Sequence, residues 1–550
     1  MNRIKHSALI LLFCFFVLEG LAQEEDLKSI YADVEFKMEQ ITEPKFQETE
    51  YLITDFGAKG DGQFKNTEAF QMAIAKAFSQ GGGTVVVPEG IWYTGPITLK
   101  SNINLHLKQG ALILFSDQFD DYPLVETSYE GLKSARSTSP INALGAKNIA
   151  ITGKGIIDGN GGAWRPVKKS KMTQHQWNAL ISSGGVLSDN KSVWYPDEAA
   201  LKGSKSDLNG WTIEQLQTVR SFLRPVMVSL VDCENILLDG PTFQNSPAWN
   251  IHPLMSRNII VRNLTVRNPW YAQNGDGLDL ESCENVLVYN NTFDVGDDAI
   301  CIKSGKNEDG RKRNMPTKNV IIKNNTVYHG HGGFVVGSEM SGGVSKIHIS
   351  HCNFIGTDTG LRFKSTRGRG GVVEQIYISH IYMSEIKTDA IRFNLYYGGQ
   401  APDLSNDLAE NKEDRDIPEV TIETPSFKDI YISDITSVKA HKSGFFMGLP
   451  EMNIQNVSIK NSLFHGEKGF TLIDTDQVHF NNVKIEATEA PMQLHNSKNL
   501  TLEQLDFLSE ESTNIQISGA KTKNISLKYS GAAQDYQIKS GVESSEIIVK

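Results

Sequence analysis

Four seven-residue segments in the middle of the chain align with one another without gaps. They read Asp276-Gly-Leu-Asp-Leu-Glu-Ser282, Asp298-Ala-Ile-Cys-Ile-Lys-Ser304, Gly332-Gly-Phe-Val-Val-Gly-Ser338 and Thr359-Gly-Leu-Arg-Phe-Lys-Ser365, and Asp389-Ala-Ile-Arg-Phe-Asn394 continues the set. The third and fifth positions are always apolar, which is the alternation of a strand with one buried face. Each segment therefore predicts one short strand of a repeating unit.

The repeat extends along most of the chain. A turn residue, usually Asn, followed by alternating Ile, Val or Leu recurs roughly every 22–27 residues, for example at Asn235-Ile236, Asn258-Ile259 and Asn285-Val286. One step, from Gln375 to Asp429, is longer and fits either two coils or one coil with a long loop. Such a period with Gly and Asn turns is typical of a β-solenoid, and the leucine ladder and helix of leucine-rich repeats are missing. We expect the Asn turns to stack and hydrogen-bond between coils.

Two segments interrupt the strand pattern. Residues 67–79 place Ala69, Phe70 and Ala73 on one face of a helix, which we expect to cover the open N-terminal end of the core. The insertion 161–225 is rich in aromatic residues. These are Trp164, Trp177, Trp194, Tyr195 and Trp211. They predict either a small satellite core or a wall that stacks sugar rings.

The composition is that of a folded protein. The 550 residues are 39% hydrophobic and 22% charged with a net charge of −11, which excludes disordered, collagen-like and coiled-coil chains and disfavours a nucleic-acid partner. Residues 1–22 resemble a secretory signal peptide, residues 23–50 a flexible lead-in, and residues 51–550 a single domain. We therefore expect export to the periplasm or medium, no membrane span and a monomer. The mature cysteines Cys233, Cys283, Cys301 and Cys352 lie in apolar runs without metal-site spacing and predict buried free thiols.

Stacking the coils gathers ionisable side chains on one face. Asp276 lies one coil from Asp298, and the place of Asp297 is taken in the next coil by His331. Because strict alternation would turn Asp276 and Asp298 inward, we expect a bend or bulge there that brings both to the surface. The fourth and sixth positions of the aligned segments are expected to face solvent. They include Asp279, Glu281, Cys301, Lys303, Val335, Arg362 and Lys364.

This set of residues indicates acid–base chemistry. Crowded carboxyls lose their protons at separated pKa values, so one stays protonated while another is ionised. Three carboxylates could also hold Ca²⁺, but the adjacent histidine and cations make a metal site less suitable, so no metal or other cofactor is expected. Arg362 and Lys364, in register with the carboxylates, predict an anionic substrate such as a carboxylated sugar.

At these residues the sequence resembles glycoside hydrolase family 28, the polygalacturonases. The four family motifs occur in order. They are Asn274-Gly275-Asp276, Gly296-Asp297-Asp298, Gly330-His331-Gly332 and Arg362-Phe363-Lys364. Gly275 and Phe363 depart from the family's Thr and Ile, but both lie between the functional positions. The resemblance implies an all-β, right-handed parallel β-helix, no cofactor, and hydrolysis of α-1,4-galacturonosyl links in pectin with inversion.

The resemblance also implies a role for each residue. Asp297 is the general acid, Asp276 and Asp298 hold and activate the water, and His331 supports the protonation of the acid. The substrate-binding residues are Asn274, Arg362 and Lys364. Residues 337–343 and the long insertion are similar to exo-acting members. The alternatives are a rhamnogalacturonan hydrolase, a Ca²⁺-dependent pectate lyase and a non-catalytic β-helix that binds glycans.

Overall fold

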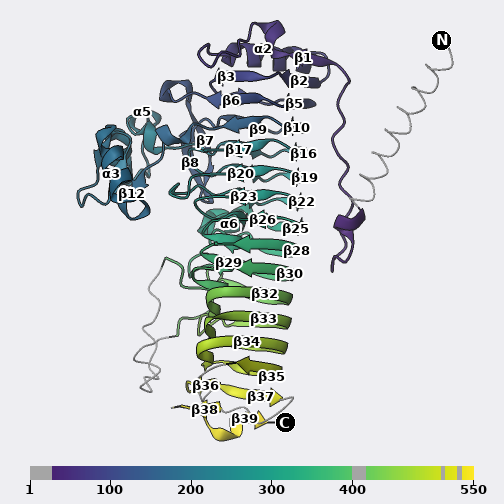
Figure 1. The fold of residues 1–550 in the computed structure, drawn as a ribbon, viewed down its shortest axis with the longest axis vertical. Helices are drawn as coiled ribbons and strands as arrows, with labels where there is room; N and C mark the ends of the chain where they lie inside the picture. The colour runs from purple at the N-terminus through teal and green to yellow at the C-terminus, as the bar shows by residue number, and fades with distance from the viewer. Residues whose placement is uncertain (1–27, 399–416, 509–513, 529–535, 540, 550) are drawn as a thin grey trace, which may run out of the picture. The chain divides into compact units, whose positions relative to one another are not determined.

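The computed structural model describes residues 28–398, 417–508, 514–528, 536–539 and 541–549 (Figure 1). The chain divides into two compact units, residues 1–40 and residues 41–550. In the first unit, the described residues 28–40 contain one short helical turn at 28–31. The expected signal peptide, residues 1–22, lies outside the described residues. None of the described helices is long and apolar enough to cross a membrane.

The second unit is a parallel β-helix, in which each coil pairs in parallel with the next (Figure 1). One row of strands carries the candidate site and is called the site face below. It consists of β9 (Ile141–Leu144), β15 (Val228–Val231), β18 (Ile251–Leu254), β21 (Leu278–Glu281), β24 (Ile300–Lys303), β27 (Gly332–Gly337), β29 (Thr359–Lys364) and β31 (Asp389–Asn394). The register places Leu278, Ile300, Phe334, Leu361 and Ile391 one above another, as the gap-free alignment predicts.

Two further rows close each coil. The second row contains β10 (Lys147–Gly153), β16 (Glu234–Asp239), β19 (Arg257–Arg262), β22 (Glu284–Tyr289) and β25 (Thr317–Lys323), and the third β11 (Ile156–Asp158), β17 (Thr242–Gln244), β20 (Thr265–Arg267), β23 (Thr292–Asp294) and β26 (Thr326–Val327). Later strands are longer and turn the corners. They include β28 (Val344–Ile355), β30 (Val372–Ser384) and β32 (Ser426–Met447). Ile376 of β30 pairs with Ile430 of β32, so the long step is one coil with an insertion.

The expected helix forms as α2 (Thr67–Ser79) and buries Ala69, Phe70 and Ala73 against the first coils, where it caps the core (Figure 1). The asparagine turns also form as expected. Asn148 donates to Asn102 over 3.0 Å, and Asn319 donates to Asn285 over 3.0 Å. These asparagines adopt positive φ, which Asn tolerates better than most residues. Together the capping helix and the strand rows confirm the predicted all-β parallel β-helix.

The tryptophan-rich insertion forms satellite cores beside the coils. Trp177 and Trp194 are buried with Val167 in one cluster, and Trp164 is buried against Tyr122. These three tryptophans are therefore not available as a wall for stacking sugar rings. Cys233, Cys283, Cys301 and Cys352 are buried free thiols, as predicted.

The expectation that the fourth and sixth strand positions face solvent is wrong. Asp279, Glu281 and Cys301 point away from the core but are completely buried. Arg313 of α6 (Asn307–Arg313) donates to Glu281 and to Ser128 in the hairpin of β7 (Leu124–Tyr129) and β8 (Leu132–Ser137), so the helix and the hairpin cover Glu281. The buried charges are paired across coils. Lys303 lies 3.1 Å from Glu339, and Arg313 pairs with Glu281 at 2.5 Å.

Candidate active site

The three aspartates of the predicted site lie in the turns that lead into the site face. Asp276 and Asp298 precede β21 and β24, and the chain bends at Gly277 and Ala299, so strand alternation does not apply to them. The amide of Gly277 donates to the carbonyl of Asp298 over 2.9 Å, which places the two turns one coil apart. The expected bend is present, but the expectation that it brings both aspartates to the surface is wrong, because both are buried.

Asp276, Asp297 and Asp298 form one carboxylate cluster. One oxygen from each lies within 4.8 Å of the others. Such a set could hold a cation, but both oxygens of Asp298 are already engaged. Its Oδ1 accepts from Arg362 Nη1 at 3.0 Å, and its Oδ2 accepts from Lys364 Nζ at 2.6 Å. The charges of Arg362 and Lys364 therefore already balance the Asp298 carboxylate, and both of its oxygens are occupied. The three aspartates fit a site without a metal better.

His331 joins the cluster through Asp297. Its Nδ1 lies 3.1 Å from Asp297 Oδ1, and its Nε2 lies 3.7 Å from Asp358 Oδ2 on the opposite side. Asp358 is a candidate that the sequence motifs missed. The amide of Thr359 donates to the carbonyl of His331, so Asp358 occupies the position of His331 one coil later. Starting the fourth aligned segment one residue earlier would have found it.

Asn274 lies beside the cluster and is half-buried. Its Oδ1 accepts from Arg224 Nη2 over 2.8 Å, and Arg224 also donates to the carbonyls of Pro247 and Gln273. Arg224 thus orients the turn that carries Asn274 and Asp276. No sequence signal pointed to this residue, because it lies about fifty positions earlier, at the end of the insertion.

The environments of the three carboxyls separate their pKa values. Burial raises the pKa of Asp276 well above its ordinary value, and the carboxyls of Asp279 and Asp297 raise it further. Burial acts on Asp298 as well, but Lys364 and Arg362 outweigh it and hold the pKa of Asp298 far below its usual range. The surroundings therefore favour the ionised form of Asp298 and the protonated form of Asp276 in the ligand-free cluster.

Asp297 and His331 form an ion pair that shifts both groups. Burial acts to raise the pKa of Asp297, but the hydrogen bond from His331 leaves it lower than usual. The same hydrogen bond raises the pKa of His331 against the effect of burial. In the ligand-free protein the pairing thus favours a protonated His331 beside an ionised Asp297. This differs from a simple protonated Asp297, the state that the acid role implied by the resemblance requires.

The site face is filled on the upstream side of Asp276. Trp249 lies one coil before Asp276, because Ile251 pairs with Leu278. Its ring packs 4.9 Å from the ring of Tyr129, at the tip of the β7–β8 hairpin, and both side chains are buried. We call Tyr129 and Trp249 the upstream wall. Lys303 Nζ lies 4.8 Å from the Trp249 ring. The same ammonium group pairs with Glu339, so it contacts both the wall and a buried carboxylate.

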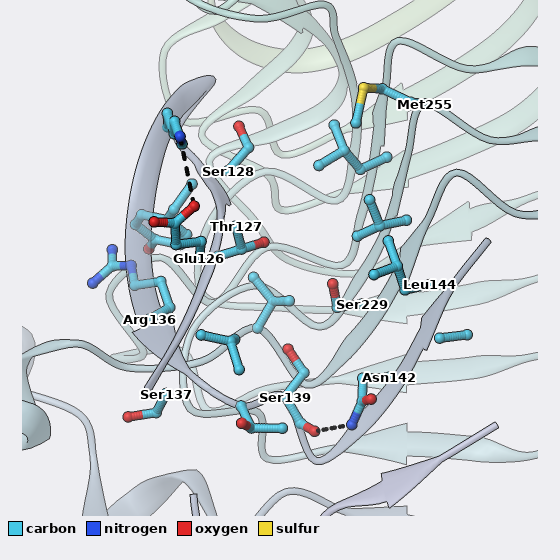
Figure 2. A pocket seen from close by; sticks show the side chains of 18 of the residues that line it. Glu126, Thr127, Ser128, Arg136, Ser137, Ser139, Asn142, Leu144, Ser229 and Met255 are labelled. Carbon is cyan, nitrogen blue, oxygen red and sulfur yellow. Dashed lines mark hydrogen bonds and ion pairs between the residues drawn. The ribbon is translucent and has the colours of Figure 1, made fainter. Parts of the chain in front are cut away.

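A larger cavity lies under the same hairpin and is separate from the carboxylate cluster. It has a volume of about 630 Å³, and its floor includes Asn142, Leu144 and Ser229 of the site face (Figure 2). Its roof includes Thr127 and Arg136 of the hairpin. None of the three clustered aspartates, nor His331, lines it. A smaller cavity lies beside the cluster and is lined by His331, Arg362 and Lys364, which contact Asp297 and Asp298.

A β-helix with crowded carboxylates, a histidine and two cations on one face defines an acid–base enzyme of the parallel β-helix class. Residues 209–424 match glycosyl hydrolases family 28, and residues 52–221 match the family described as rhamnogalacturonase A/epimerase, pectate lyase-like. The crystal structure of an exopolygalacturonase from Thermotoga maritima is similar, with a TM-score of 0.66 and 30% identity over 80% of this chain and 93% of that chain.

Two curated relatives agree. The exo-poly-alpha-D-galacturonosidase of Dickeya chrysanthemi is 33% identical over 63% of this chain and 57% of its own length. A probable polygalacturonase of Vitis vinifera is 32% identical over 61% of this chain and 61% of its own length. The match spans less than two thirds of either relative. The chain belongs to family 28 of the glycosyl hydrolases.

Proposed function

We propose that the protein hydrolyses α-1,4-galacturonosyl linkages of polygalacturonate, and that it acts from a chain end. The observation that carries the hydrolysis is the carboxylate cluster itself, in which the pKa of Asp298 is lowered and that of Asp276 is raised while their oxygens lie within 4.8 Å of one another. Glycoside hydrolysis needs one ionised and one protonated carboxyl. The proposal of an anionic substrate rests on Arg362 and Lys364, which bring two positive charges to the edge of the cluster.

The upstream wall supports chain-end action. Because Trp249 and Tyr129 fill the site face one coil before Asp276, little of a polymer can extend past the cluster on that side. One coil rises about 4.8 Å, which is comparable to the length of one sugar unit. The similar exopolygalacturonase of Thermotoga maritima and the exo-acting enzyme of Dickeya chrysanthemi are consistent with this proposal.

In the proposed mechanism, Asp297 donates a proton to the glycosidic oxygen as the C1–O bond breaks. His331, paired with Asp297, is the reservoir for that proton. A water molecule attacks C1 from the opposite face and loses its proton to the pair formed by Asp276 and Asp298. The pKa order in the ligand-free site favours Asp276 as the acid instead, so the two aspartates are the alternatives that an experiment must separate.

Incubation with polygalacturonate and with its methyl ester tests the function. We expect monomer or another single short product from polygalacturonate, and poor cleavage of the ester, because Arg362 and Lys364 would lose their anionic partner. A ladder of products would contradict chain-end action. A product that absorbs in the ultraviolet, and whose formation EDTA inhibits, would indicate a Ca²⁺-dependent lyase. Binding without turnover would indicate a glycan-binding protein. Activity restricted to rhamnogalacturonan would indicate the related hydrolase.

We propose that the protein works outside the cytoplasm, on the basis of its N-terminal segment, and separately that it is a monomer. Cell fractionation with N-terminal sequencing of the mature protein tests the export, and light scattering tests the monomer. A protein that retains residues 1–22 in the cytoplasm would contradict the first part.

A further inference from the structure

The cationic row of the site continues one coil past the residues that the family motif contains. Arg362 pairs in register with Arg392, and Lys364 with Asn394, on the neighbouring strands β29 and β31. A single cavity of about 380 Å³ runs from His331 past Arg362 and Lys364 to Arg392 and Asn394. The cavity beside the partners of the carboxylate cluster therefore extends to this next coil.

One coil further, an aromatic side chain lies on the same outward face. Phe445 pairs in register with Arg392, while the next residue, Phe446, turns into the core and stacks on Phe393 at 4.6 Å. The Arg392 guanidinium and Lys442 Nζ each lie 5.1 Å from the Phe445 ring. A half-buried outward aromatic ring thus has a cation on each of two sides.

The charges in this part of the site face are unbalanced. Arg392 is 33% exposed and pairs with Asp389 at 2.6 Å, and Asp389 also lies opposite Lys442. One carboxylate therefore serves two cations. A carboxylated sugar would balance the remaining positive charge, because its ring can lie on the aromatic face while its carboxylate pairs with a guanidinium.

We propose that Arg392, Phe445 and Lys442 form a second uronate-binding subsite, one coil past Arg362 and on the side of the cluster away from the upstream wall. The proposal rests on the proposed function for the direction of the chain. Because the upstream wall closes the other side of the cluster, a bound polymer leaves the cluster across Arg362 and then Arg392. The coil spacing of about 4.8 Å brings successive sugars to successive coils.

The test compares digalacturonate with trigalacturonate, in turnover by the full-length protein and in calorimetric binding to the Asp297→Asn variant. Wild type should favour the trimer. Arg392→Gln should weaken binding and kcat/KM for the trimer about tenfold or more, the range expected for a hydrogen bond to a charged group, and change the dimer less than about twofold. Phe445→Ala should act in the same direction and leaves Asp389 paired, so it covers the case in which Arg392→Gln fails to fold.

Lys428→Gln is the matched control, because Lys428 lies on the same strand as Phe445 but pairs with Glu374 at 3.1 Å. It should behave like wild type on both oligomers. Hydrolysis of the trimer at wild-type rates by both Arg392→Gln and Phe445→Ala would overturn the subsite alone. Trimer binding that depends on Arg392 without any turnover would support the subsite and contradict the proposed function. Absence of binding to either oligomer would overturn both.

Discussion

Lys364 donates a 2.6 Å hydrogen bond to Oδ2 of Asp298, two coils away. The cation that the family motif assigns to the substrate is thus already engaged with a carboxylate of the acid–base cluster. Lys364 is also the more enclosed of the two cations, with 8% of its side chain exposed against 19% for Arg362. The two residues are therefore expected to contribute differently to binding and to chemistry.

Replacing Lys364 by Met should lower kcat and shift the acidic limb of the pH–rate profile to higher pH. Lys364 holds the pKa of Asp298 down, so its removal lets that pKa rise, and the base is active only when ionised. Arg362→Gln should mainly raise KM, because Arg362 is more accessible to a substrate carboxylate. Initial rates on polygalacturonate between pH 3 and 8 measure both effects. Identical profiles for the two variants would show that they act as one unit.

The two candidate acids are separated by the leaving group. An acid variant loses activity on polygalacturonate but recovers on 4-nitrophenyl galacturonide, whose leaving group departs without protonation. We expect Asp297→Asn to lower kcat on the polymer by several orders of magnitude, with little change in KM and substantial recovery on the aryl substrate. Asp276→Asn should be impaired on both substrates. The reverse pattern would make Asp276 the acid, as the pKa order of the ligand-free site favours.

Asp358 is expected to position His331 and to keep it protonated. Its carboxylate is one of the groups that raise the pKa of His331, so Asp358→Asn should lower that pKa. A histidine with a lower pKa loses its proton at lower pH, so the alkaline limb of kcat/KM should move toward lower pH. Lys387→Met is the control, since Lys387 contacts Asp358 at 3.9 Å without contacting His331, and its profile should stay in place. An unmoved limb in Asp358→Asn would remove Asp358 from the site.

The buried pair of Glu339 and Lys303 should make stability depend on pH. Burial acts to raise the pKa of Glu339, but Lys303 and Lys364 lower it to about 2. A carboxyl with a depressed folded-state pKa stabilises the fold above its unfolded value, near 4.5, and that stability is lost as the pH falls toward about 2. The pair contributes on the order of 3 kcal/mol at pH 7.

Glu339→Gln should therefore lower the thermal midpoint at pH 7, where it leaves the Lys303 charge less well paired in the interior. The difference from wild type should shrink as the pH falls below about 4, because wild type then loses the same interaction. Thermal unfolding followed by circular dichroism at pH 7 and pH 3 measures this. Glu308→Gln, which breaks an exposed pair with Lys312 on α6, is the control and should have little effect at either pH.

The sequence predicted the fold and the meeting of the site residues because both depend on strand period and coil spacing. Aligning Leu278 with Ile300 and Phe334 is enough to place Asp276 next to Asp298 and His331 next to Asp297. Register alone could also have placed Asp358. Burial could not be predicted in this way. The hairpin that packs on Trp249, the ring beside Lys303, lies far earlier in the chain, and nothing in the repeat indicates where an insertion folds back. The order of the pKa values depends on that burial, so it could not be predicted from the sequence either.

The stereochemistry of hydrolysis provides the decisive test of the mechanism. Acid and base are about 6.5–9.5 Å apart in inverting glycosidases, and the two carboxyls about 5–5.5 Å apart in retaining ones. Oxygens of the three aspartates lie within 4.8 Å here, so separation alone favours retention. However, a retaining enzyme needs a free carboxylate as nucleophile, and both oxygens of Asp298 are engaged by Arg362 and Lys364.

Engaged oxygens suit a residue that orients water better than one that attacks carbon, so we expect inversion. Proton NMR during the first turnovers of an α-linked oligogalacturonide should show the β-anomer before mutarotation mixes the two forms. If the α-anomer appears first, the enzyme retains configuration. Asp297 would then be the nucleophile and Asp276, whose pKa is raised in the ligand-free site, the acid.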